Sequence, residues 1–242
     1  MIFNLFKSKP TLRELIPDGF VDIHSHILPS IDDGAKNINE SKNLIEEMKS
    51  MGFSKVIATP HSYPGLYDNT VDSIKSSFNE VKNINLKNIN LDYAAEYMIG
   101  KYMINEAEKG TLLCLKDKYI LVEMSYISPP IDLYEILFNL IHNGYKPILA
   151  HPERYSYYHN DYKSFYKLKK IGCFFQSNLL SFSGYYGNYV TKFAEKLLDD
   201  GLIDFTGSDV HKLTHISAFE QKVGIKNYKK LTMVSEKNEF FN

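Results

Sequence analysis

Two histidines stand one residue apart in the run FVDIHSH, which covers residues 20–26. Successive side chains of a β-strand point to opposite faces, so His24 and His26 can lie on one face and bind the same ion. Asp209 and His211 have the same spacing in SDVH and can pair in the same way. Imidazoles and carboxylates are ligands of Mn, Fe and Zn, whereas Mg prefers oxygen ligands alone. This spacing therefore indicates metal chemistry.

Candidate ligands recur after other apolar runs along the chain. The full set is His24, His26, Asp33, His61, Glu96, Glu123, His151, Asp209 and His211. One ion takes about four to six ligands, so the set predicts two or three ions with bridging carboxylates. Taken alone, a histidine at a strand end is more often a structural residue, and a lone glutamate is more often solvated. Repetition at the same end of consecutive strands favours a multinuclear site. His142, His159 and His215 lack such neighbours, and we expect them to be structural.

These ligands require elements that bring them together. Apolar, β-branched or aromatic runs predict strands at 20–26, 55–61, 91–97, 119–125, 146–153, 174–180 and 202–211. Patterns of helical period lie between strands at 39–51, 71–84, 133–143 and 188–200. This alternation predicts a parallel sheet with helical crossovers. Strand ends converge on one face in a closed barrel but spread along a line in an open sheet. The predicted fold class is therefore α/β, a distorted seven-stranded (β/α)7 TIM-like barrel.

Residues that cap helices mark the ends of several predicted helices. Four glycines each follow a helical pattern and precede a strand, at Gly52, Gly144, Gly172 and Gly201. A left-handed cap is needed there, and glycine adopts it without strain. Asn37, with Glu40 three residues later, predicts a capping box at the start of the first helix.

The composition predicts one globular domain without a nucleic-acid partner. Lys and Arg total 28 against 29 for Asp and Glu, so the charge gives no basis for binding nucleic acid or an anionic membrane. Two unpatterned cysteines fit a reduced, cytoplasmic interior. No apolar stretch approaches the roughly 18 residues that span a bilayer.

The sequence predicts a single domain at 20–242 and an N-terminal extension at 1–19. Its start, MIFNLFKSKP, has too short an apolar run for a signal peptide and is expected to be a brief amphipathic segment.

Arginine occurs only at Arg13 and Arg154, and Arg154 lies three residues after His151 on the predicted metal face. Its planar fork suits bidentate contact with phosphate or carboxylate. Metal ions beside an arginine suit hydrolysis of a phosphate ester, because both can stabilise charge on the phosphoryl oxygens. The alternative for Arg154 is a structural ion pair, for example with Glu153.

A thiol mechanism can be tested on the sequence. Cysteine-dependent tyrosine phosphatases need an arginine six residues after the nucleophile. The residues six positions after Cys114 and Cys173 are Ile120 and Leu179, which excludes that mechanism.

An ordered set of motifs carries a family resemblance over about residues 20–225. The motifs are DIHSHILPSIDDGAKN, ATPHSY, AAEYMIG, LVEMS, ILAHPERY, SNLLSFSG and TGSDVH. The sequence resembles the metal-dependent tyrosine phosphatases of the polymerase-and-histidinol-phosphatase (PHP) superfamily, which are bacterial enzymes commonly encoded with capsule or exopolysaccharide genes. The resemblance implies a seven-stranded barrel with three divalent ions, manganese preferred and iron or zinc as alternatives. It also implies hydrolysis of phosphotyrosine on a partner tyrosine kinase that controls polysaccharide export.

Carried over motif by motif, the resemblance implies the same nine metal ligands and a phosphate-binding role for Arg154. Asp32 stands beside Asp33, and the motif alignment favours Asp33 as the ligand. The implied reaction is in-line attack by metal-bound hydroxide, with Asp209 or a metal-bound water as proton donor. Four tyrosines follow barrel strands and are candidates for stacking on the substrate ring, although packing is the commoner role: Tyr63, Tyr67, Tyr126 and Tyr155.

Two alternatives remain open from the sequence. One is a small-molecule phosphatase of the same superfamily, acting for example on histidinol phosphate. The other is a non-catalytic module in which metals stabilise the barrel and its face docks a kinase. The sequence does not determine the oligomeric state, and it is compatible with a homo-oligomer.

Overall fold

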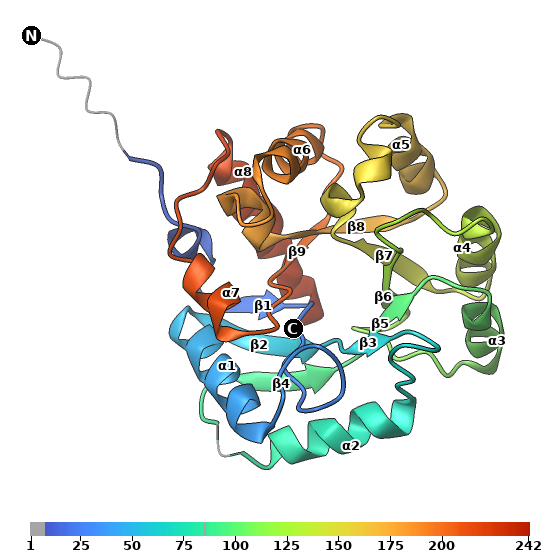
Figure 1. The fold of residues 1–242 in the computed structure, drawn as a ribbon, viewed down its shortest axis with the longest axis horizontal. Coiled ribbons are helices and arrows are strands. Elements are labelled where there is room, and N and C mark those ends of the chain that lie inside the picture. The colour runs from blue at the N-terminus through green and yellow to red at the C-terminus, as the bar shows by residue number, and fades with distance from the viewer. Residues whose placement is uncertain (1–7, 85) are drawn as a thin grey trace, which may run out of the picture.

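The computed structural model describes residues 8–84 and 86–242, and its strands are all parallel (Figure 1). The first sheet has the order β1-β2-β4, and the second has the order β3-β5-β6-β7-β8-β9. The strands are β1 (Phe20–Asp22), β2 (Phe53–Ala58), β3 (His61–Ser62), β4 (Asn90–Tyr93), β5 (Glu96–Met98), β6 (Tyr119–Glu123), β7 (Lys146–Ala150), β8 (Phe174–Asn178) and β9 (Phe205–Gly207). The predicted α/β fold with parallel strands is confirmed.

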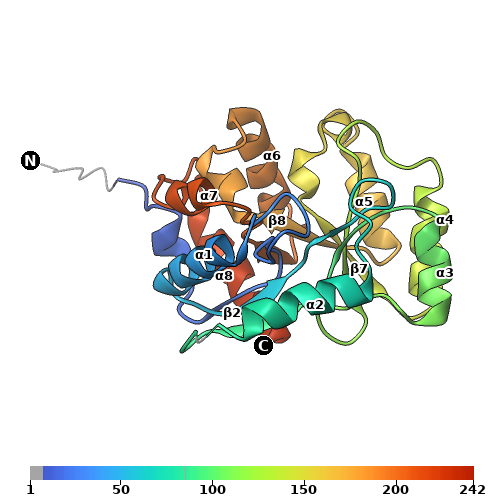
Figure 2. The same ribbon diagram turned by 60° about the horizontal axis from the view of Figure 1, so that its bottom comes forward.

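Helices cover the outside of the strands in both views (Figures 1 and 2). They are α1 (Ile38–Ser50), α2 (Val71–Lys82), α3 (Tyr102–Lys109), α4 (Leu133–His142), α5 (Lys163–Lys170), α6 (Asn188–Asp199), α7 (Leu213–Ala218) and α8 (Tyr228–Ser235). The 3-10 turns are η1 (Arg13–Leu15), η2 (Pro152–Arg154), η3 (Ser156–Tyr158), η4 (Leu179–Ser183) and η5 (Glu236–Phe241). The four helices expected from periodicity correspond to α1, α2, α4 and α6. In the described residues, no helix combines the length and the apolar content that a membrane crossing requires.

Two of the seven predicted strands are interrupted. The run 55–61 forms β2 and β3, and the run 91–97 forms β4 and β5, so the strand count of seven stays a prediction. Pro60 lies at the first break and has no N–H with which to continue a ladder. Its carbonyl still accepts a hydrogen bond from the Glu96 N–H at 3.0 Å, so the two interruptions lie side by side.

The chain returns to its first strand beyond β9. Ser25 and Val210 form a parallel bridge there. The Asp209 N–H donates to the His24 carbonyl at 2.8 Å, and the His26 N–H donates to the Val210 carbonyl at 2.9 Å. The two ends of the strand series therefore meet at the level of the candidate ligands.

Two apolar layers hold these elements. The smaller cluster contains alternate strand residues, among them Val21, Ile23, Leu121 and Ile148, together with Phe241 from η5. The larger cluster joins the other faces of the strands to the helices. Alternation of side chains between two faces places one set inside the ring of strands and the other against the helices, as in a TIM-like barrel.

The helix caps largely follow the sequence. Gly52, Gly144, Gly172 and Gly201 have φ values of 96°, 82°, 101° and 71°, which is the left-handed region that favours glycine. Asn37 caps α1 through its side-chain oxygen, which accepts from the N–H groups of Asn39 and Glu40. In the predicted capping box, the Glu40 carboxylate would also accept from the Asn37 N–H. It accepts from the Lys36 N–H instead.

The described part of the N-terminal segment packs on the domain. Leu12 is fully buried, and its N–H donates to the carbonyl of Gln221 at 3.0 Å. Arg13 forms an ion pair of 2.8 Å with Glu220. Most of the predicted amphipathic start, residues 1–7, lies outside the described residues.

Candidate metal centre

The nine candidate ligands meet at the carboxyl ends of the strands. Their donor atoms form four overlapping groups in which all atoms lie within 4.8 Å of one another. The groups are His26–Asp33–His61–His211, His24–His151–Asp209, His24–His26–Glu96 and His61–Glu96–Glu123. Residues from β1 to beyond β9 therefore contribute to one cluster, as the barrel prediction requires.

Glu96, on β5, is the central carboxylate of this cluster. Its Oε2 lies 3.2 Å from Nε2 of His24, 3.4 Å from Nε2 of His26 and 3.1 Å from Nδ1 of His61. Its Oε1 lies 3.1 Å from Nε2 of His151. One carboxylate thus faces four imidazoles from three different segments, which is the position of a ligand that bridges ions.

The two neighbouring aspartates have different positions. Asp33 Oδ1 lies 3.4 Å from Nε2 of both His61 and His211, so it faces the cluster. Asp32 is turned away from it and accepts at 2.7 Å from Nδ1 of His26. Asp32 therefore orients a candidate ligand, and Asp33 is the better candidate ligand itself.

Asp209 and His211 differ from the pairing expected of residues two apart on a strand. Asp209 belongs to the group with His24 and His151, whereas His211 belongs to the group with Asp33. Asp209 has a φ of 52°, which turns the chain and breaks the alternation. His151 is also left-handed, with a φ of 36°. Such conformations cost about 1–3 kcal/mol and mark sites that the surrounding structure holds in place.

Burial and neighbouring imidazoles set the charge of the glutamates. Burial disfavours the ionised form of Glu96, but His24 and His61 outweigh it and hold the pKa of this carboxyl well below its usual range. Burial raises the pKa of Glu123, and the negative charge of Glu96 adds to that shift. The two carboxylates therefore compete for the same positive charge.

The pKa values of the imidazoles are also shifted in opposite directions. Burial lowers the pKa of His26, but the nearby Asp32 carboxylate outweighs this and raises it to about 10. Burial lowers the pKa of His151 to about 4. Metal ligands must be deprotonated, so an ion that binds here would replace protons on imidazoles such as His26.

Two buried atoms would suit a cation as their partner. Within the described residues, Glu96 Oε2 and His61 Nδ1 lie 3.1 Å apart, but neither atom makes a hydrogen bond of acceptable geometry. Buried polar atoms are satisfied in the great majority of native structures. Both atoms belong to the group of His61, Glu96 and Glu123, and a divalent ion would satisfy them together. The donor set therefore fits divalent metal ions.

Two amides on β8 connect the candidate ligands from behind. Gln176 Oε1 lies 2.8 Å from Nδ1 of His24, and its Nε2 donates to Oδ1 of Asn178 at 3.0 Å. Asn178 Nδ2 donates to Oδ2 of Asp209 at 2.6 Å. This series of hydrogen bonds fixes the orientation of His24 and Asp209. The sequence analysis did not identify it. The signal was present, because FFQSN places two polar residues at alternate positions of a strand expected to be buried.

Two glycines leave the room that the first histidines need. A Cβ on Gly34 would lie 2.0 Å from the His26 carbonyl oxygen, and one on Gly207 would lie 2.7 Å from the Cβ of His24. Neither backbone nor Cβ atoms can move away as a flexible side chain can. The glycine of the DDG motif therefore has a steric role beside His26.

Arg154 follows β7 and reaches over the cluster. Its Nη1 donates to Oδ2 of Asp209 at 3.1 Å, and the guanidinium lies 4.8 Å from the ring centre of Tyr126 and 4.2 Å from that of Tyr186. The alternative ion pair with Glu153 is absent, because that carboxylate accepts from the Asn178 N–H and the Ser181 hydroxyl instead. Arg154 is thus in contact with two aromatic rings and lines the cavity.

A cavity of about 350 Å³ opens above the cluster. Its lining includes seven of the candidate ligands, together with Arg154, Lys212 and His215. His215, expected to be structural, accepts a hydrogen bond at 3.3 Å from the His211 N–H. His142 is exposed on α4, and His159 stacks on Phe193, so both lie outside this lining.

The four tyrosines considered for stacking differ in their access to the cavity. Tyr126 lines it, whereas Tyr67 is not part of its lining but stacks on His61 with ring centres 5.3 Å apart. Tyr63 forms a backbone bridge with Tyr67. Tyr155 is fully buried and its hydroxyl accepts from the Met124 N–H at 2.9 Å, so its role is packing.

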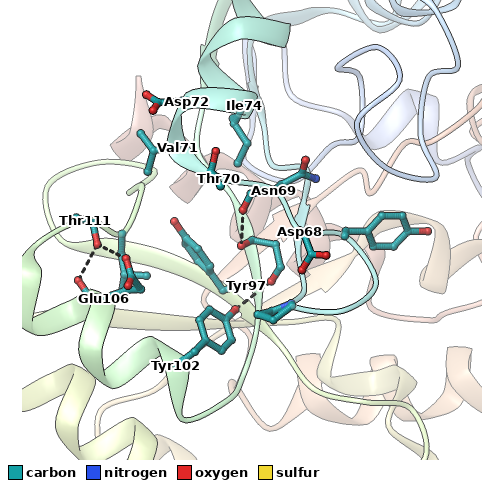
Figure 3. Close-up of a pocket in the computed structure, with 14 residues that line it drawn as sticks. Asp68, Asn69, Thr70, Val71, Asp72, Ile74, Tyr97, Tyr102, Glu106 and Thr111 are labelled. Carbon is teal, nitrogen blue, oxygen red and sulfur yellow. Dashed lines mark hydrogen bonds between the residues drawn. The ribbon is translucent and has the colours of Figure 1, made fainter.

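A larger cavity of about 490 Å³ lies between the loop after β3 and α3 (Figure 3). Tyr97 and Tyr102 lie between the Glu106–Thr111 pair and the loop of Asp68. None of the nine candidate ligands and neither arginine lines it. The candidate ligands are therefore all outside this larger cavity.

Comparison with known proteins places the chain in one family. The family described as capsular polysaccharide synthesis, CpsB/CapC, matches residues 20–231. CapC of Staphylococcus aureus is 32% identical over 199 residues, covering 81% of this chain and 78% of CapC. The tyrosine-protein phosphatase YwqE of Bacillus subtilis is 30% identical over 197 residues, covering 80% of this chain and 78% of YwqE.

Solved structures agree with the fold. A crystal structure described as YwqE from Bacillus subtilis and CpsB from Streptococcus pneumoniae, unique metal-dependent tyrosine phosphatases, has a TM-score of 0.77 at 28% identity. The match covers 92% of this chain and 88% of that one. A histidinol phosphate phosphatase from Lactococcus lactis matches with a TM-score of 0.56 at 11% identity, over 92% of this chain and 94% of that one. At this identity the match shows a similar fold alone. This chain belongs to the CpsB/CapC family of capsular polysaccharide synthesis.

Proposed function

We propose that this protein is a metal-dependent protein-tyrosine phosphatase of capsule or exopolysaccharide synthesis. One observation carries the proposal: four overlapping ligand groups lie in one cavity together with Arg154. Relatives of at least 30% identity bear the name tyrosine-protein phosphatase and are covered over more than two thirds of their length. The proposed ligands are the nine residues predicted from the sequence.

The cluster has enough groups for three ions, with manganese preferred and iron or zinc as alternatives. Bound divalent ions would lower the pKa of a water towards about 7 and withdraw charge from the phosphoryl oxygens. Glu96 would bridge ions, because its two oxygens face different imidazoles. Cytoplasmic location, and a bacterial tyrosine kinase as the phosphorylated partner, belong to the same proposal.

The protein's own residues would position the ester. Arg154 would bind the phosphoryl oxygens through its planar fork, which Tyr126 and Tyr186 hold in place. Burial disfavours ionised Asp209, but His24, His211 and Arg154 hold the pKa of its carboxyl below the usual range. We therefore assign Asp209 to metal binding and to the orientation of Arg154 rather than to proton donation. A phenolate has a pKa near 10 and needs little help in leaving.

A thiolate nucleophile is disfavoured by the structure as well as by the sequence. Burial raises the pKa of Cys173 to about 12. Burial also raises the pKa of Cys114 above its ordinary value. Neither thiol lines the cavity above the metal cluster.

The test is hydrolysis of a phosphotyrosyl peptide with and without a chelator, with metal analysis of the same preparation. We expect activity to disappear on chelation, to return with manganese, and to survive in the double variant Cys114→Ser/Cys173→Ser. Full activity in the chelator would defeat the proposal. Faster turnover of histidinol phosphate than of the peptide would favour the small-molecule phosphatase instead.

A further inference from the structure

The metal cavity continues sideways into an apolar groove. A second cavity, of about 330 Å³, shares Asp33, His61, Glu123 and Tyr126 with the metal cavity. Its outer lining includes Leu66, Met98 and Ile127. Because the two cavities share these walls, a group bound at the metals has its neighbouring atoms directly in the second cavity.

The groove extends further through a third cavity of about 390 Å³. This one shares Tyr63, Met98 and Ser125 with the second and adds Pro129, Pro130 and Ile131. The described residues that line the third cavity include none with a charged side chain. We call the second and third cavities together the apolar groove.

Large apolar side chains along the groove are exposed to solvent. Ile131 is 100% exposed, Ile127 is 88% exposed and Leu66 is 63% exposed. Contiguous exposed apolar surface of this kind marks binding sites, since removing such side chains from water is favourable. The part of the metal cavity that the apolar groove does not share includes Lys212 and His215.

The walls of the groove are fixed by contacts that leave its apolar side chains free. Tyr102 donates from its hydroxyl to the Ser62 carbonyl at 3.0 Å, and Tyr157 donates to the Ser125 carbonyl at 3.0 Å. An ion pair of 3.1 Å joins Lys101, before α3, to Asp132, before α4. These helices lie side by side in both views (Figures 1 and 2). A pre-formed groove costs little ordering on binding.

We propose that the apolar groove binds the polypeptide that flanks the phosphotyrosine, through uncharged, apolar side chains on one side of it. This inference rests on the proposed phosphatase function and gives its substrate a chemical description. The continuity of the groove with the metal cavity favours the substrate as occupant over a second copy of the chain. A small phosphate ester would fill the metal cavity without reaching Ile131.

The test compares three substrates: p-nitrophenyl phosphate, a phosphotyrosyl peptide with leucines at the flanking positions, and the same peptide with aspartates there. We expect the wild-type protein to prefer the leucine peptide by about tenfold in kcat/KM, as one apolar pocket discriminates. Ile131→Glu should remove this preference through KM, and Ile131→Leu should keep it. Both variants should leave p-nitrophenyl phosphate hydrolysis unchanged. Met233→Glu, at a 64% exposed position on α8, is the matched control.

Three results would contradict the inference. Equal kcat/KM for the two peptides in the wild type would show that the groove does not read the flank. A wild-type dimer that Ile131→Glu dissociates would make the groove a self-association surface. Failure of the metal-loaded wild type on all three substrates would instead remove the proposed function on which the inference depends.

Discussion

The guanidinium of Arg154 and the amide of Asn178 donate to the same oxygen, Oδ2 of Asp209, at 3.1 and 2.6 Å. The other oxygen, Oδ1, lies 3.3 Å from Nε2 of His24. One carboxylate therefore separates the candidate metal ligands from the candidate phosphate-binding arginine. It would hold both at a fixed separation while a phosphate ester binds between them.

This relationship predicts that lysine cannot replace Arg154. Lysine lacks the planar fork that could contact Asp209 and the phosphate together, and it has no planar group to stack on Tyr126 and Tyr186. We expect Arg154→Lys to lower kcat/KM for a phosphotyrosyl peptide by about a hundredfold or more. Metal content should stay at the wild-type level. Steady-state kinetics and metal analysis check this, and loss of metal together with activity would assign Arg154 a structural role.

Metal removal should lower the thermal stability of the protein. The buried glutamates Glu96 and Glu123 share positive charge that ions would supply. Ligand at a hundred times its Kd stabilises by about 2.7 kcal/mol, which corresponds to a Tm shift of about 5–10 °C for a domain of this size. We expect manganese to raise the Tm of chelated protein by that amount.

The matched variants for this experiment are Glu96→Gln, which should lose most of the shift, and Glu236→Gln, an exposed position on η5, which should keep it. An unchanged Tm on chelation, in protein shown to have released its metal, would contradict the prediction.

The sequence predicts the order and approximate position of the strands well, because apolar runs follow from burial alone. Five of the predicted strands, however, extend two to four residues beyond the observed carboxyl ends of β1, β6, β7, β8 and β9. The sequence predicts the breaks within two strands poorly, because the hydrogen bond from Glu96 to Pro60 joins residues from two separate runs. It also misses the short helices α3, α5, α7 and α8, which have six to eight residues and few periodic positions.

The candidate site also contains residues that the sequence predicts and residues that it does not. The nine candidate ligands could be selected from residue type and position, since imidazole and carboxylate carry the chemistry themselves. The amides Gln176 and Asn178 could not be assigned, because an amide in a strand is significant only through the residues that it contacts. The left-handed conformation of Asp209 was also hidden, since the sequence alone gives no φ for an aspartate.

Gln176 should control metal affinity without binding metal. Its Oε1 accepts from Nδ1 of His24 and so leaves Nε2 free for the cluster. Outer hydrogen-bond partners of metal ligands are worth about 10–100-fold in affinity. We expect Gln176→Leu to weaken metal binding by that factor in a competition titration with a metal-binding dye. Gln176→Glu, which keeps the acceptor, should recover part of it.

Ser177→Ala is the control for Gln176, because its side chain points to the other face of β8. Equal affinities for Gln176→Leu and Ser177→Ala would mean that the amide does not orient His24.

The left-handed backbone at His151 predicts a reversal of the usual order of glycine and alanine. At a φ of 36°, a Cβ is strained, so His151→Gly should be more stable than His151→Ala by about 1 kcal/mol. At His61, on β3, the order should be the ordinary one, with alanine more stable than glycine by about 0.5–1 kcal/mol. Urea unfolding in chelator measures all four variants without a contribution from metal. Alanine as stable as glycine at position 151 would mean that the apoprotein relaxes this turn, and that metal binding rather than folding holds His151 in place.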